Sequence, residues 1–151
     1  MRADGRPFAV VQTKFDERDA QFSPDGKWIA YQSDRSGTFE IYIQPFPAGR
    51  EPVRISPSGG VQVRWRSDGR ELFYLGLDGR LMAVPVAFPE VASQPQVGAP
   101  ASLFMAPVGS LRDIALHHYI VSRDGERFLF DAIVDEMPSP IVVILNWAPP
   151  Q

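Results

Sequence analysis

Short apolar segments alternate with polar turn residues along the chain, and one arrangement of them occurs three times. Residues 20–31, 63–74 and 119–130 each contain a short apolar strand, an Asp-Gly pair and a second apolar strand. Asp-Gly between apolar runs is a strong hairpin signal, because the turn requires a positive φ that glycine adopts freely and the Asp side chain can bond to the turn backbone. The pattern therefore predicts three related hairpins, and we find no long amphipathic helix.

The spacing of the Asp-Gly pairs indicates an internal repeat. Asp25 and Asp68 are 43 residues apart, and Asp68 and Asp124 are 56 residues apart. A period in the low forties, filled by four strands, is typical of a β-propeller blade. The longer second interval contains residues 89–107, rich in Pro, Ala, Ser and Gln, which we interpret as an extended outer loop.

Further strands complete each predicted blade. The third-strand segments are 39–44, 80–86 and 141–146, and the outer segments are 52–56, 101–105 and, ahead of the first hairpin, 7–12. We therefore predict an all-β fold, a partial β-propeller of about three four-stranded antiparallel blades. The prediction is a single domain over residues 1–151, with blades at 18–57, 61–106 and 117–147 and an outer strand at 7–12.

Aromatic side chains recur at equivalent strand positions of the three repeats, among them Phe22, Trp65 and Phe128. Such positions usually pack between neighbouring blades, so we predict a core role for these rings rather than a stacking platform for a ligand.

Composition and charge narrow the classes of partner. The chain is 44% hydrophobic and 22% charged, as in ordinary soluble domains. The net charge of -3 provides no basic stripe, so we expect no nucleic acid partner. The absence of cysteine excludes disulfides and thiol chemistry without fixing the compartment. No apolar run approaches roughly 18 residues, so we expect no direct membrane insertion.

The segment from Phe22 to Tyr31, with Pro24, Asp25 and Gly26 at its turn, resembles the Pro-Asp type of WD40-like β-propeller repeat of TolB-like proteins. The match weakens in the later repeats, where Ser67 and Arg123 replace Pro24; it extends over nearly all of residues 7–147.

Residues 34–47, 65–74 and 143–147 also resemble the C-terminal propeller of certain bacterial serine/threonine protein kinases. That resemblance implies an extracytoplasmic sensor that follows a membrane span. The chain lacks the kinase glycine-rich loop and the His-Arg-Asp and Asp-Phe-Gly motifs, so kinase activity does not carry over.

Residues suited to chemistry are sparse. The recurring Asp-Gly carboxylates are explained by their turns. His117 and His118 are adjacent, and neighbouring strand residues point to opposite faces, which disfavours a shared metal. Asp131, Asp135 and Glu136 lack the spacing of a calcium loop, and no Gly-x-Ser-x-Gly nucleophile turn is present. We therefore predict no catalytic residue, no metal site and no cofactor.

Binding is expected where the loops that enter the innermost strands meet at one rim, because loops on a rigid scaffold often carry function. These loops are polar and charged. The candidate contacts are Asp16, Glu17, Arg64, Arg112, Asp113 and His118.

The function expected from these observations is a non-enzymatic module for protein or peptide binding, sensing or scaffolding. The alternative is an accessory or regulatory propeller of a kinase or peptidase whose catalytic part lies elsewhere, and an inert remnant is a third possibility. Three blades cannot close a ring that needs roughly four to eight. We therefore expect either a homodimer that completes a six-bladed ring or the missing part of a longer propeller as partner.

Overall fold

The structure, a computed structural model, describes residues 7–47, 50–89, 94–109, 111, 117–132 and 141–144. Within these ranges the chain forms strands and no helix. The strands are β1 (Glu17–Phe22), β2 (Trp28–Ser33), β3 (Glu40–Pro45), β4 (Val53–Arg54), β5 (Val61–Trp65), β6 (Glu71–Leu75), β7 (Arg80–Ala87), β8 (Gln96–Val97), β9 (Ala101–Met105), β10 (Tyr119–Val121), β11 (Phe128–Asp131) and β12 (Ile141–Ile144).

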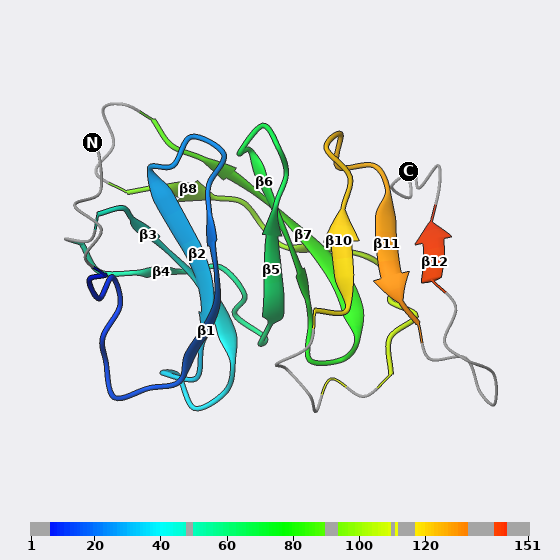
Figure 1. Cartoon of the computed structure of the whole chain (residues 1–151), viewed down its shortest axis with the longest axis horizontal. Coiled ribbons are helices and arrows are strands. Elements are labelled where there is room, and N and C mark those ends of the chain that lie inside the picture. Colours follow the sequence, from blue (N-terminus) through cyan, green and yellow to red (C-terminus); the bar gives the residue numbers. More distant parts are fainter. Residues whose placement is uncertain are drawn as a thin grey trace.

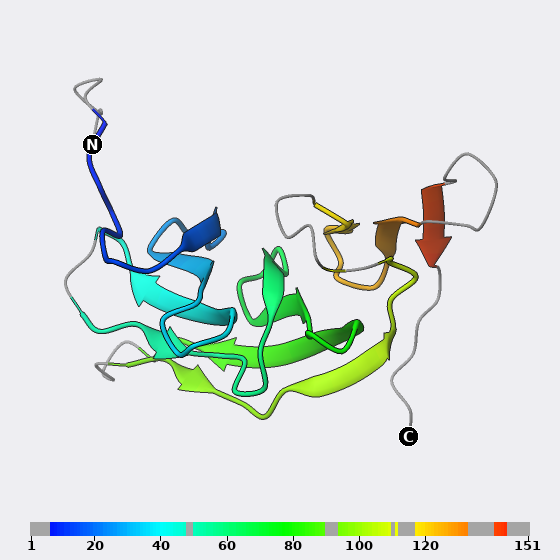
Figure 2. The ribbon, with the colours of Figure 1, turned by 90° about the horizontal axis from the view of Figure 1, so that it is seen from below.

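The strands form three antiparallel sheets that follow one another along the sequence (Figure 1). Blade 1 has the order β1-β2-β3-β4, and blade 2 begins β5-β6-β7. Blade 3 has the order β10-β11-β12. Figure 2 shows the sheets side by side in an open arc, with β1, β5 and β10 on the concave side. The arrangement is that of propeller blades around part of a channel.

The fourth place in blade 2 is shared by two strands, which corrects the interpretation of residues 89–107 as an outer loop. The strand β9 pairs with the first half of β7, from Arg80 to Ala83, and β8 pairs with its end at Val86 and Ala87. Between them Gly98 N donates to Pro85 O at 2.8 Å. Because β7 has eight residues and runs past β6, its outer edge offers room for both strands.

Apolar side chains fill the spaces between neighbouring blades. One cluster joins Ile41 and Ile43 of blade 1 to Leu72 and Val84 of blade 2. A second joins blade 2 to blade 3, and it contains Phe73, Leu81, Tyr119, Phe128 and Phe130. Most of the aromatic positions predicted to pack between blades do so. Phe22 does not, with 58% of its surface exposed, and neither does Tyr31, which packs with Ile29 and Tyr42 on the outer face of blade 1.

Residues 7–12 form no strand, so the predicted outer strand is wrong. Val10 and Val11 instead pack against Ile29, Tyr31 and Tyr42 on the face of blade 1 that has no neighbouring blade. Burial of these apolar side chains places the segment across the face of the sheet rather than along its edge.

The Asp-Gly turns have the predicted chemistry. Asp25 Oδ1 accepts from Lys27 N at 3.1 Å, and Asp68 Oδ1 accepts from Arg70 N at 2.9 Å. Asp124 makes the same contact in blade 3. Each of these carboxylates therefore stabilises its own turn by accepting a hydrogen bond from the turn backbone. No helix in the described segments has the length and apolarity to pass through a bilayer.

Candidate binding site at the inner rim

A β-bulge lies at the same place in the inner strands of blades 1 and 2. The register shifts between Arg18 and Gln21 in β1, and between Val61 and Arg64 in β5. The bulges contain Asp19 with φ 49° and Gln62 with φ 57°, both in the left-handed region that non-glycine residues seldom adopt. A β-bulge reorients the side chains of its strand, and the bulges at Asp19 and Gln62 set the orientation of the polar side chains at the rim.

A series of side-chain amides connects the bulges to their neighbours. Gln32 Oε1 in blade 1 accepts from Gln62 N in blade 2 at 2.8 Å. Gln62 Oε1 in turn accepts from His118 N, before blade 3, also at 2.8 Å. All three side chains are buried, so each amide satisfies a backbone donor that water does not reach.

An ion pair spans blades 1 and 2 at the rim. Arg64 Nη1 lies 2.8 Å from Asp19 Oδ2, and it also donates to Val63 O at 2.6 Å. Gln21 Nε2 donates to Asp19 Oδ1 at 3.2 Å. The Asp19 and Arg64 side chains are only 7% and 11% exposed, so the pair is shielded from solvent and from salt.

Arg64 also reaches blade 3. Its guanidinium carbon lies 5.6 Å from the centre of the Tyr119 ring, and its Nη2 contacts His117 Nδ1. His117 Nδ1 lies 3.5 Å from Asp19 Oδ1. Burial raises the pKa of the Tyr119 hydroxyl well above its usual range, so Tyr119 stays neutral. Arg64 thus touches residues of all three blades.

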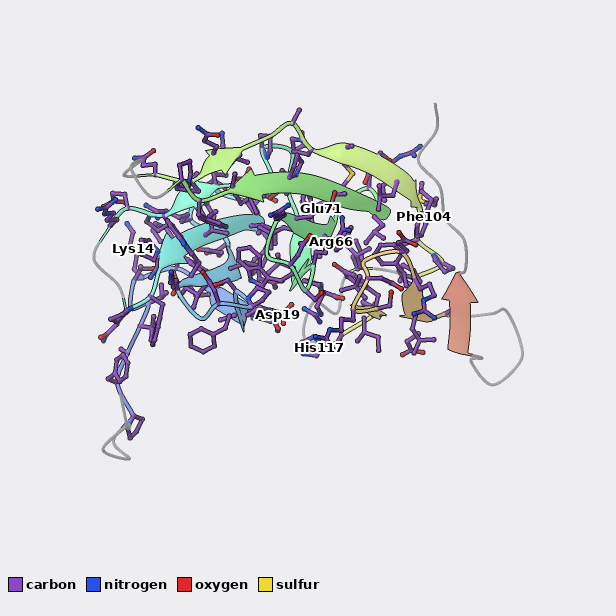
Figure 3. The ribbon with its side chains drawn as sticks, turned by 90° about the horizontal axis from the view of Figure 1, so that it is seen from above. Lys14, Asp19, Arg66, Glu71, Phe104 and His117 are labelled. Atoms are coloured by element: carbon purple, nitrogen blue, oxygen red, sulfur yellow. The ribbon has the colours of Figure 1, made fainter. Side chains whose placement is uncertain are left out.

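Asp19, Arg64 and His117 form the rim cluster, and His117 is its exposed member. Its side chain is 58% exposed, and Figure 3 shows it beside Asp19 on the inner side of the arc. Since a guanidinium has no acceptor, a neutral His117 must accept from Arg64 at Nδ1 and therefore carries its proton on Nε2. The cluster can therefore offer an N–H donor to a ligand that approaches from solvent.

The predicted candidate contacts do not all come together. Arg64 lies at the centre of the cluster. Asp16 pairs instead with Arg18 at 2.6 Å, and the hydrogen bond from Arg18 lowers the pKa of the Asp16 carboxyl. Glu17 accepts from the Thr13 hydroxyl. Arg112 and Asp113 lie outside the described residues.

The structure places His117 in the rim cluster, and not the predicted contact His118. His118 is buried at 8% exposure; its N donates to Gln62 Oε1 and its O accepts from Asp131 N, whereas His117 reaches the rim cluster. Neither His117 nor Asp19 is among the contacts predicted from the sequence. The alternation of faces required one histidine to point outward but did not say which, and the bulge that turns Asp19 inward has no local sequence signal.

Among the described residues, no group of three or more His, Asp or Glu side chains is arranged to hold a metal ion.

The three sheets and their shared channel side define an open, partial β-propeller. Comparison of the sequence with protein-family models and with curated proteins gives no match. Among solved structures, the chain is similar to TolB from Acinetobacter baumannii, with a TM-score of 0.56 and 18% identity over 87% of this chain and 30% of that one. It is also similar to an oligogalacturonate lyase from Vibrio parahaemolyticus, with a TM-score of 0.53 and 17% identity over 80% of this chain and 31% of that one.

These similarities show the fold alone. The chain has a TolB-like propeller fold and spans less than a third of the length of either protein. The resemblance to kinase-associated propellers gains no support from these structures and stays a prediction.

Proposed function

We propose that this chain is a non-enzymatic propeller module that binds a protein or peptide at its inner rim, with His117 as the outward contact. The observation that carries the proposal is the Asp19–Arg64 ion pair, which holds residues from three blades in one place beneath an exposed imidazole. Rigid support of an exposed polar group is what specific recognition requires.

The chemistry of the cluster favours an acceptor-rich partner. The Nε2–H of His117 can donate to a carboxylate or to a main-chain carbonyl, and both are abundant in peptides. The Asp19 charge is already neutralised by Arg64, so the cluster does not repel an anionic group as a free carboxylate would.

Selection from a displayed random-peptide library against the immobilised protein tests the proposal. We expect an enriched peptide whose affinity falls at least tenfold in His117→Ala, since loss of one well-placed hydrogen bond and its packing costs about 1.4 kcal/mol or more. The matched control is Arg127→Ala, which removes a 55% exposed side chain from the Asp-Gly turn of blade 3 and should leave the affinity unchanged.

Two outcomes contradict the proposal. One is a library that yields no enriched peptide against a folded protein. The other is a peptide whose affinity falls equally in both variants, which would place its site away from the rim. Circular dichroism of each variant separates loss of binding from loss of fold.

A further inference from the structure

The two end faces of the arc differ in how they are covered. On blade 1, residues 7–12 lie over Tyr31 and Tyr42, but Phe22 on the inner strand stays 58% exposed. On blade 3, the outward face of β10 and β11 carries Ile120, which is 56% exposed, and the half-buried Leu129. Both ends therefore present a large apolar side chain from an inner strand.

These two side chains occupy positions that meet inside the arc. Phe22 pairs with the second residue of β2, Trp65 with the second residue of β6, and Val121 with the first residue of β11. These three residues hold equivalent places in the three hairpins. By the same register, Gln21 is equivalent to Ile120. Between blades 1 and 2, Trp65 Nε1 donates to Gln21 O at 3.3 Å. Phe22 and Ile120 thus hold the places of the two residues that meet between blades 1 and 2, and because Phe22 lacks the indole N–H, its contact at a seam would be apolar.

A hollow on blade 3 includes Ile120 and Leu129 in its lining. Its volume is about 320 Å³, and it is lined by His117, His118, Tyr119, Ile120, Leu129, Phe130 and Asp131. An aromatic ring such as that of Phe22, placed over this open hollow, would cover Ile120.

One member of the amide series, Gln32, has a polar counterpart in blade 3, whereas the equivalent position in blade 2 is the buried Leu75. Gln32 accepts from the backbone N of the bulge residue Gln62 in the next blade. By strand register, Asp131 holds the place of Gln32 in blade 3, and Asp19 holds the place of Gln62 in blade 1. The Asp131 carboxylate is therefore placed to accept from a bulge such as the one at Asp19.

We propose that blade 3 of one chain docks on the inner part of blade 1 of a second copy, so that two chains close a six-bladed ring. Phe22 of each copy enters the hollow beside Ile120 of the other, and a twofold axis along the channel makes the two seams identical. A ring of six blades is within the range of roughly four to eight blades that closed propellers contain. This inference does not depend on peptide binding at the rim.

The absence of cysteine allows a direct test of the seam. In the double variant Phe22→Cys/Ile120→Cys, we expect a disulfide-linked dimer on a non-reducing gel. A disulfide needs Cα atoms within about 7 Å, and blade 2 separates the two positions within one chain, so the link must join two copies (Figure 2). The matched control is Phe22→Cys/Met105→Cys, because Met105 is 57% exposed but lies on the outer strand β9.

Light scattering after gel filtration gives the second readout. We expect the unmodified chain at twice its 16.8 kDa, the variant Ile120→Asp at 16.8 kDa, and Met105→Asp still at the dimer mass. A folded wild-type chain at 16.8 kDa overturns the proposal. Equal cross-linking in the two cysteine pairs also overturns it, and this result does not rely on the folding of Ile120→Asp.

Discussion

Arg64 Nη1 lies 2.8 Å from Asp19 Oδ2, although the two residues are 45 positions apart in the sequence. Loss of one member of so enclosed a pair leaves the other charge without its counter-ion. We therefore expect Arg64→Met to lower the free energy of unfolding by about 3 kcal/mol, measured by urea denaturation.

The control for this variant is Arg80→Met. Arg80 is 48% exposed and pairs with the 62% exposed Asp78 at 3.6 Å, an arrangement that contributes less than about 1 kcal/mol. Equal losses in the two variants would mean that the Asp19–Arg64 pair does not hold the blades together.

The buried Gln62 side chain gives a second prediction. Gln62→Leu removes the acceptor for His118 N and leaves that buried donor without its bond. We expect a loss of about 2 kcal/mol in the free energy of unfolding. Gln96→Leu, at an exposed position of β8, should change stability by less than about 0.5 kcal/mol. A Gln62→Leu protein as stable as wild type would show that the series of amides is dispensable.

The turn glycines of blades 1 and 3 differ in their surroundings. Gly26 has φ 69° with nothing within 4 Å of an added Cβ, whereas at Gly125, with φ 78°, that atom would lie 3.1 Å from the Arg66 side chain. Gly26→Ala should therefore cost about 1 kcal/mol of backbone strain, and Gly125→Ala more.

The Arg66→Ala background separates the two causes of the Gly125 effect. There the Gly125→Ala penalty should fall to that of Gly26→Ala, as measured by thermal unfolding of the four variants. A penalty unchanged by Arg66→Ala would show that blade 2 does not press on this turn.

Asp25 predicts a dependence of stability on pH. Its hydrogen bond from the Ser23 hydroxyl, at 2.6 Å, lowers the pKa of its carboxyl, with a smaller contribution from Lys27 N. A depressed folded-state pKa stabilises the protein above the unfolded value of about 3.9, and the contribution disappears as the pH falls through the folded value. The stability gap between wild type and Asp25→Asn should therefore be present at neutral pH and close as the pH falls through the folded-state pKa.

Denaturation curves at several pH values measure that gap. The Asn side chain can still accept from Lys27 N, so the comparison isolates the charge of residue 25. A gap that stays constant down to the lowest pH would mean that the Ser23 hydroxyl does not favour the ionised carboxylate.

Local signals in the sequence explain most of the correct predictions of the fold. The Asp-Gly turns located the hairpins, and the apolar segment 101–105 coincides with β9, Ala101–Met105. Such features depend on hydrogen bonds over two to five residues, as in the turn from Ser23 to Trp28. They can be recognised without knowledge of the tertiary structure.

The errors concern contacts between distant residues. Residues 7–12 pack on a sheet face only because blade 1 has no neighbour there within the chain. The strand β8 exists because β7 extends beyond β6. The rim cluster joins Asp19, Arg64 and His117 across separations that no periodic pattern encodes, so only Arg64 was selected in advance.

The direction of the amide series has a consequence for synthesis. Gln32 offers its acceptor to a residue 30 positions later, and Gln62 to one 56 positions later. A ribosome therefore releases each acceptor before the donor that it binds, and domains generally fold from the N-terminus as they emerge. We expect a nascent chain that has completed blade 1 to serve as the template for blade 2, and blade 2 for the strand that follows His118. The order of translation and the order of assembly then coincide.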